Sequence, residues 1–92
     1  MKKTRVRGVI LEDNHIILIH RDRDGKEYYV FPGGGIEEGE DLEMTLKREC
    51  LEELGINITP MNKLYTLIEK DGSSQIFYNC CKVSGVLGTG QG

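Results

Sequence analysis

The stretch that decides the fold runs from Gly34 to Ile56 and reads GGIEEGEDLEMTLKRECLEELGI. Its glycines and acidic residues lead into a segment predicted to be helical from about Asp41 to Leu54, and Gly55 can end this helix by adopting the left-handed conformation. The last turns of the helix carry three glutamates: Glu49, Glu52 and Glu53. Each helical residue turns by about 100°, so their carboxylates converge on one arc.

The apolar residues of this segment are expected to occupy the opposite arc and to face the core: Met44, Leu46, Cys50, Leu51 and Leu54. The acidic arc has two explanations. Three like charges at this spacing oppose the helix, and a divalent cation that prefers oxygen ligands, Mg²⁺ or Mn²⁺, would relieve the repulsion. For an isolated Glu-Glu pair, a solvated acidic face is the commoner explanation. The residues around the glutamates are therefore needed to distinguish a metal site from a solvated acidic face.

That pattern resembles the Nudix box. The residues that match its fixed positions are Gly34, Glu40, Arg48, Glu49, Glu52, Glu53, Gly55 and Ile56. The run from Pro32 to Gly35 just before the helix is also similar to the Nudix (MutT-like) hydrolase family. The resemblance implies an α/β fold, a Nudix-type α/β/α sandwich with a mixed sheet. It also implies hydrolysis of the pyrophosphate in a nucleoside diphosphate linked to another group.

The resemblance assigns roles to individual residues. The metal-binding positions that it implies are Gly34 (through its backbone carbonyl), Glu49, Glu52 and Glu53. The catalytic positions that it implies are Glu49, Arg48 and Glu52. Which of Glu49 and Glu52 acts as general base stays open, because the first position serves as ligand, base or both in different members. Arg48 matches the arginine that orients neighbouring carboxylates, with Glu40 as its partner. The alternative for Arg48 is a surface ion pair worth at most about 1 kcal/mol.

Length and composition narrow the class of protein. Ninety-two residues are expected to form a single domain. The net charge of −3 argues against general binding to nucleic-acid phosphates, so no stable nucleic-acid partner is expected. No signal-peptide core or membrane-spanning run is recognised, which predicts a cytoplasmic protein. The three cysteines lack metal-binding spacing and are expected to be reduced, structural thiols.

The rest of the chain reads as strands and turns. The expected strands are residues 5–11, 16–19, 28–31, 62–69 and 75–83, with a charged loop at 21–26 and a loop or frayed end at 84–92. The second strand is apolar on both alternating faces, which predicts a sheet covered on both sides. Only one helix is predicted, so residues 1–92 are expected to be the N-terminal and central part of a Nudix domain that lacks its C-terminal helix. The uncovered face would favour self-association.

Three residues before the helix are candidate substrate ligands: Arg21, Arg23 and Tyr29. Arginine forks suit phosphate geometry, although a run of alternating Arg and Asp is also typical of a solvated loop. Tyr28 and Tyr29 point to opposite faces of a strand, so one of them can stack on a base while the other packs.

Taken together, the sequence predicts a Mg²⁺-dependent hydrolase of nucleoside diphosphate-X compounds, including (d)NTPs, with a nucleotide-derived small molecule as substrate and Mn²⁺ as a substitute ion. One alternative is a catalytically silent nucleotide-binding or sensing module of the same fold. Another is a small interaction protein with an acidic helix and no site. The box itself does not select the nucleotide.

Overall fold

A computed structural model describes residues 3–88 of the chain. Its elements are β1 (Thr4–Glu12), β2 (His15–Ile16), β3 (Ile19–Arg23), β4 (Lys26–Val30), β5 (Gly33–Gly35), α1 (Leu42–Leu54), β6 (Ile56–Ile68) and β7 (Ser74–Gly85).

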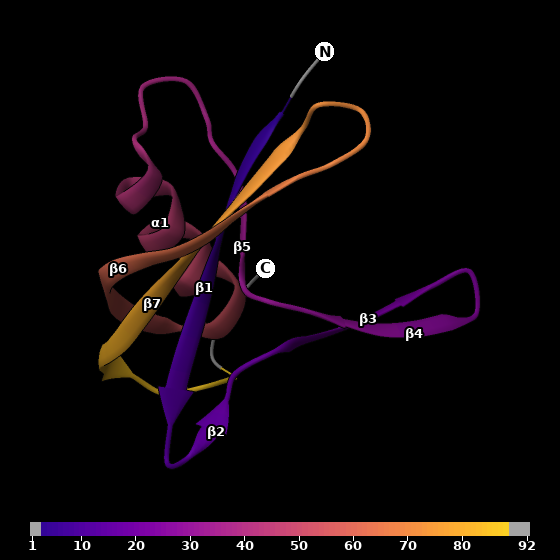
Figure 1. Cartoon of the computed structure of the whole chain (residues 1–92). Coiled ribbons are helices and arrows are strands. Elements are labelled where there is room, and N and C mark those ends of the chain that lie inside the picture. Colours follow the sequence, from indigo (N-terminus) through magenta and orange to yellow (C-terminus); the bar gives the residue numbers. More distant parts are fainter. Residues whose placement is uncertain (1–2, 89–92) are drawn as a thin grey trace.

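The main sheet has five strands. Its order is β2-β1-β7-β6, and β5 pairs with the first half of β1. The β1–β7 pair is parallel and the other pairs are antiparallel, so the sheet is mixed, as predicted. Strands β3 and β4 form a separate hairpin that projects away from the rest of the structure (Figure 1).

Helix α1 packs against one face of this sheet and makes the core with it (Figure 1). The buried apolar residues are Val6, Ile10, Leu46, Cys50, Leu54, Ile56, Ile58 and Cys80. The predicted helix is confirmed almost to the residue. Asp41 caps its start by accepting a hydrogen bond from the Met44 N–H. Gly55 ends it at φ 76°, donating its N–H to the Leu51 carbonyl.

The predicted facing of the helix was partly wrong. Met44 and Leu51 are 51% and 49% exposed, whereas Thr45 is fully buried. The side chains of Glu49 and Glu53 are only 18% and 10% exposed. The inward arc therefore includes two of the glutamates, because the edge of the sheet beneath them consists of the glycines of β5, which leave room for carboxylates.

Two predictions about the segment between β1 and β5 were also wrong. The expected strand 16–19 is broken, since β2 is only His15–Ile16 and the chain then leaves β1, whose first half pairs with β5. Leu18 is exposed, so this segment is not buried on both faces. The expected charged loop at 21–26 is instead the paired end of β3 and β4, with only Asp24 and Gly25 in the turn.

Strand β6 is longer than predicted because it starts directly after the helix, where Ile56 and Ile58 enter the core. The predicted loop 84–92 begins two residues later, since β7 continues to Gly85. Residues 89–92 lie outside the described residues. The three cysteines are free in the structure, with Cys50 and Cys80 buried and Cys81 exposed, and burial raises the pKa of Cys50 to about 12 and that of Cys80 to about 11.

Within residues 3–88, α1 is the only helix, and the sheet face opposite to it carries exposed apolar side chains, among them Leu11, Tyr65 and Val83. We expect this face to drive concentration-dependent self-association of the chain. Light scattering should show a mass that rises with concentration, and Val83→Lys should reduce this rise. Met44→Lys, which charges an exposed site on the helix, is the control and should leave it unchanged. A constant monomer mass for the parent chain would contradict the prediction.

Candidate active site

The site is built where the glycines of β5 meet the last turns of α1. Gly33 has φ 138°, and a Cβ there would lie 2.0 Å from the Val6 carbonyl oxygen. A Cβ on Gly34 would lie 2.8 Å from the Cδ and Oε2 atoms of Glu49. The absence of these side chains lets strand, helix and carboxylate approach one another closely.

Glu53 is the most enclosed carboxylate of the site. Its Oε1 accepts the Gly33 N–H at 3.1 Å, and its Oε2 accepts an Arg21 N–H at 2.9 Å. Burial raises the pKa of Glu53 and the charge of Glu49 adds to this, while the Gly33 N–H and Arg21 oppose it. An ionised carboxylate held in this way favours a nearby cation.

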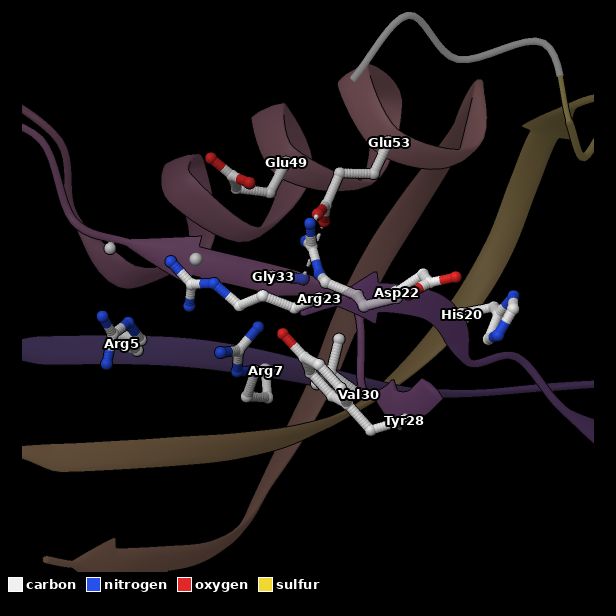
Figure 2. Close-up of a pocket in the computed structure, with 13 residues that line it drawn as sticks. Arg5, Arg7, His20, Asp22, Arg23, Tyr28, Val30, Gly33, Glu49 and Glu53 are labelled. Atoms are coloured by element: carbon white, nitrogen blue, oxygen red, sulfur yellow. Dashed lines mark hydrogen bonds and ion pairs between the residues drawn. The ribbon is translucent and has the colours of Figure 1, made fainter. Parts of the chain in front are cut away.

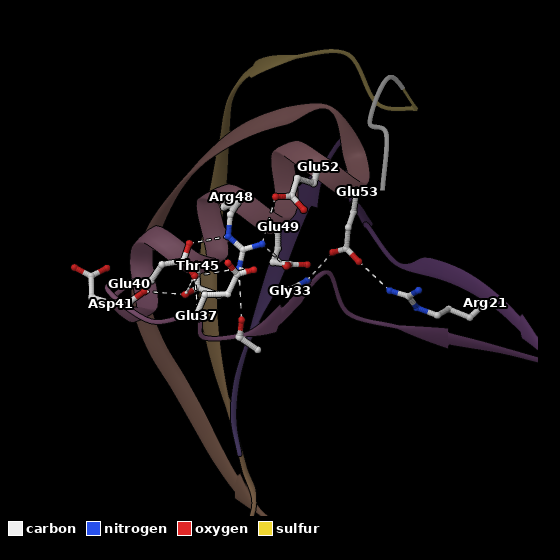
Figure 3. Close-up of polar contacts among 11 residues, drawn as sticks. Arg21, Gly33, Glu37, Glu40, Asp41, Thr45, Arg48, Glu49, Glu52 and Glu53 are labelled. Carbon is white, nitrogen blue, oxygen red and sulfur yellow. Dashed lines mark hydrogen bonds and ion pairs between the residues drawn. The ribbon is translucent and has the colours of Figure 1, made fainter. Parts of the chain in front are cut away.

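Arg48 binds the carboxylates that surround it (Figure 3). Its Nε and NH2 groups donate to the two oxygens of Glu40 at 2.7 and 3.0 Å, and its NH1 donates to Glu49 at 2.7 Å and to Glu52 at 3.3 Å. Thr45 Oγ donates to the same Glu40 at 2.9 Å. This half-buried, multidentate arrangement is more than a surface ion pair, and it fixes the rotamer of Glu49.

The same contacts set the titration of Glu40. The hydrogen bonds from Arg48 lower the pKa of Glu40 to about 2 from an ordinary value of 4.5. Its ionised form therefore stabilises the fold above about pH 4.5, and this contribution is lost as the pH falls towards 2.

Glu40→Gln is accordingly expected to destabilise the chain at neutral pH and to do so less in acid. Urea unfolding at several pH values measures the difference in free energy of unfolding between parent and variant, which should shrink below about pH 4.5. Glu38→Gln removes an exposed carboxylate and should match the parent at each pH. A difference that is the same at neutral and acid pH would contradict the assignment.

The donor set fits a divalent cation. Glu49, Glu53 and the backbone of Gly34 border one cleft, and carboxylate and carbonyl oxygens are the ligands that Mg²⁺ and Mn²⁺ prefer. Glu52 lies outside the cleft lining, with its side chain 52% exposed. Among residues 3–88, no three Asp, Glu, His or Cys side chains are already gathered around one point. Arg48 donates to Oε1 of Glu49 and to Oε1 of Glu52, while Gly33 and Arg21 donate to the two oxygens of Glu53.

The cleft has a volume of about 830 Å³ and places these carboxylates opposite four arginines. Glu49 and Glu53 come from α1, while Arg5 and Arg7 come from β1 on the other side (Figure 2). Arg21 and Arg23 come from β3. The surface thus offers ligands for a cation and ligands for anions within one cavity.

The register of the β3–β4 hairpin orders its side chains. Arg21 and Tyr28 are cross-strand partners and share a face with Arg23, and all three line the cleft. Tyr29 pairs with His20, and its exposed ring lies 5.1 Å from the His20 ring, outside the cleft lining. Of the two tyrosines, Tyr28 is therefore the one placed at the cavity.

Sequence reasoning did not single out five residues that line the cleft: Arg5, Arg7, His20, Asp22 and Val30. A signal was present for the first two, because Arg5 and Arg7 alternate with the buried Val6 and Gly8 along β1 and so share the opposite face. No comparable signal in the sequence indicates that these side chains border the same cleft as the glutamates of the helix.

Two neighbouring glycines allow a sharp test of the site. In Gly34→Ala the new Cβ would displace the Glu49 carboxylate, so we expect activity to fall by about tenfold or more with little change in stability. In Gly35→Ala the Cβ meets nothing within 4 Å, and activity should be retained. Steady-state hydrolysis and thermal unfolding of both variants make the comparison. Equal activities would show that the position of Glu49 is unimportant.

The profile of the NUDIX domain matches residues 1–86. An RNA pyrophosphohydrolase of Caulobacter vibrioides is 44% identical over 52 residues, which are 53% of this chain and 30% of that protein. The uncharacterized Nudix hydrolase YvcI of Bacillus subtilis is 39% identical over 71 residues, which are 74% of this chain and 44% of that protein. The chain thus matches less than half the length of either relative.

Solved structures agree on the fold. The solution structure of the E. coli ORF135 protein superposes with a TM-score of 0.77 at 27% identity, covering 99% of this chain and 69% of that chain. Within residues 3–88, no helix is both long and apolar enough to cross a membrane. A domain profile that covers almost every residue, together with this fold, shows that the chain belongs to the Nudix family.

Proposed function

We propose that the chain is a Mg²⁺-dependent pyrophosphohydrolase of nucleoside 5′-polyphosphates and related nucleoside diphosphate-X compounds. The observation that carries the proposal is the cleft that faces Glu49 and Glu53 with four arginines. A polyphosphate is the nucleotide group that matches both sides, because arginine forks bind phosphate oxygens and the carboxylates hold a phosphate-bound cation.

Glu49, Glu52, Glu53 and the Gly34 carbonyl would hold the ion. When bound, it supplies positive charge to the phosphoryl oxygens and makes an attacking water more acidic. Arg48 positions the carboxylates of Glu49 and Glu52, to which it is hydrogen-bonded.

The proposed reaction is hydrolysis by direct attack of water, without a covalent enzyme intermediate. Water attacks one phosphorus of the pyrophosphate, the bridging P–O bond breaks, and the proton of the water passes to a carboxylate base. Glu49 is the base in our proposal, because Arg48 and the adjacent Gly34 fix its position, whereas Glu52 is half exposed. Arg21 and Arg23 bind the charge that spreads over the phosphoryl oxygens.

We assign to Tyr28 the stacking contact with the nucleobase. Its ring lines the cleft on the same hairpin face as Arg21, so the phosphate contacts and the nucleobase contact come from one face of the β3–β4 hairpin. An aromatic ring stacks on any base, which favours broad use of nucleotides over strict selection. The relatives named RNA pyrophosphohydrolase make a 5′-triphosphate end of RNA one of the substrates to test.

A panel of phosphate compounds tests the proposal. The chain is incubated with Mg²⁺ and dGTP, ATP, ADP-ribose, a UDP-sugar, diadenosine tetraphosphate or a 5′-triphosphate oligoribonucleotide, and products are followed by ³¹P NMR. We expect hydrolysis at a pyrophosphate bond that stops with EDTA and resumes with Mg²⁺ or Mn²⁺. An absence of turnover on every compound would overturn the enzyme proposal.

The binding module without turnover is the second candidate. It is favoured by the arrangement of Glu49, Glu52 and Glu53, which are all engaged by arginines or backbone. The same panel discriminates the two, since a silent module would show nucleotide-dependent shifts in NMR spectra and no new phosphate signals.

A further inference from the structure

Arg7 differs from the other arginines of the cleft in how firmly it is held. Its Nε donates to Gln75 Oε1 at 3.0 Å, and its NH1 donates to the Phe31 carbonyl at 3.1 Å. Both contacts are partly buried and join segments 24 and 68 residues apart in sequence. In the described part of the chain, Arg5 and Arg23 make no side-chain hydrogen bond, and Arg21 is engaged by Glu53. Arg7 is therefore the preorganised cation of the cavity.

The Gln75 amide is itself fixed in orientation. Its Nε2 donates to Glu69 Oε1 at 2.9 Å. Because an ionised carboxylate can only accept, the amide nitrogen must face Glu69, and the amide oxygen is then turned to the Arg7 Nε–H. The chain Glu69–Gln75–Arg7 runs from the β6–β7 turn across the sheet to the cleft. It holds the guanidinium through a neutral acceptor, so that no carboxylate is in direct contact with the Arg7 charge.

Among the described residues, no carboxylate lies within ion-pair distance of the Arg7 guanidinium, and Glu53 and Glu49 attract it only at longer range across the cleft. Two of its five N–H groups are used by Gln75 and Phe31. Figure 2 shows the group on the strand side of the cavity, between Arg5 and Tyr28 and across from the helix. A half-buried cation with free donors in a cavity favours an anionic ligand.

We propose that Arg7 is the fixed phosphate-binding residue of the cleft, and that Gln75 is the positioning residue that aims it. The ligand is a phosphate or pyrophosphate group, and its identity as part of a nucleotide rests on the proposed function. The fork of Arg7 donates its remaining N–H groups to the phosphate oxygens. Arg21 and Arg23, on the projecting hairpin, supply contacts that adjust to the particular substrate.

Binding of inorganic pyrophosphate to the metal-free chain, measured by calorimetry in EDTA, tests the role of Arg7 without any turnover. Arg7→Gln should weaken binding by about tenfold or more, as expected for a charge-assisted hydrogen bond. Arg5→Gln is the matched control, since it removes an arginine from the same strand face and cavity, and it should weaken binding by no more than about threefold. Equal losses in the two variants would show a general charge effect and overturn the proposal.

Two substitutions at Gln75 test the positioning role and leave Arg7 in place. Gln75→Leu removes the acceptor, and Gln75→Glu keeps an acceptor but pairs it with the Arg7 charge. Both should weaken pyrophosphate binding by about threefold to tenfold, and both should raise KM for a hydrolysed nucleotide more than they lower kcat. Native pyrophosphate binding in both variants would overturn the role of Gln75, and these variants also serve if Arg7→Gln fails to fold in a thermal melt.

The outcomes separate this inference from the proposed function. Nucleotide hydrolysis that is insensitive to Arg7→Gln overturns the inference alone. Pyrophosphate binding that depends on Arg7, in a chain that hydrolyses no member of the substrate panel, overturns the proposed function alone.

Discussion

Glu53→Gln is expected to reduce hydrolysis by at least about 100-fold and to leave the fold intact. In the proposed function Glu53 is a ligand for Mg²⁺, and because a glutamine amide is a poor ligand for this ion, the variant should lose several kcal/mol of transition-state stabilisation. Its amide oxygen can still accept the Gly33 N–H, which the Glu53 carboxylate accepts at 3.1 Å. The structural contact between β5 and α1 is thereby preserved while the charge is removed.

Stability should stay equal or rise in the same variant. Burial raises the pKa of Glu53, so its ionised form is disfavoured in the folded chain relative to the unfolded one at neutral pH. The neutral amide removes that cost and loses one partly exposed ion pair with Arg21, whose contribution is small. Opposite directions for activity and stability are what distinguish a functional residue from a structural one.

The matched control is Glu43→Gln, which makes the same charge change in the first turn of α1, where Glu43 is exposed. It should keep full activity. Initial rates at saturating Mg²⁺ and melting temperatures of both variants complete the comparison. If Glu53→Gln keeps more than about a tenth of the parental rate, or if Glu43→Gln loses as much, Glu53 is not a metal ligand.

The helix and its ends could be predicted because their signals are local. Asp41 as the cap, Gly55 as the terminator and the apolar residues between them act within a few residues of sequence. The box pattern likewise placed Glu49 and Glu53 on adjacent turns. The sequence did not predict that these two glutamates face inward, since this orientation depends on β5 passing beneath the helix.

The arginines show a second limit. Arg21 was recognised as a candidate by its residue type. The charged residues around it led to the prediction of a loop where the structure has a strand, so its cross-strand pairing with Tyr28 was not predicted. Arg7 was missed because its guanidinium is held in the cleft by hydrogen bonds to Gln75 and Phe31, which are remote in sequence. The arginines of the cleft are brought together by contacts between segments that are distant in sequence. The glutamates of the cleft lie within one contiguous motif.

Gly33→Ala is expected to lower the free energy of unfolding by about 2–5 kcal/mol, the largest stability loss that we predict for a single methyl group in this chain. The new Cβ would lie 2.0 Å from the Val6 carbonyl oxygen and 3.0 Å from the Arg7 Cα, and the backbone at φ 138° is itself unfavourable for alanine. Because both neighbours are backbone atoms of the central strand β1, no rotamer change can relieve the clash.

Two other glycines separate the causes of this loss. Gly25→Ala has a positive φ of 76° and nothing within 4 Å of its Cβ, so it should cost about 1 kcal/mol. Gly35→Ala has neither problem and should be nearly neutral. Urea unfolding of the three variants should give the order Gly33, Gly25, Gly35 from most to least destabilised. The Gly33 N–H also donates to Glu53, and alanine keeps this N–H, but the displacement of β5 that the new Cβ forces should move it and weaken metal binding as well. A stable Gly33→Ala chain with native Mn²⁺ affinity would mean that β5 does not lie against β1 as described.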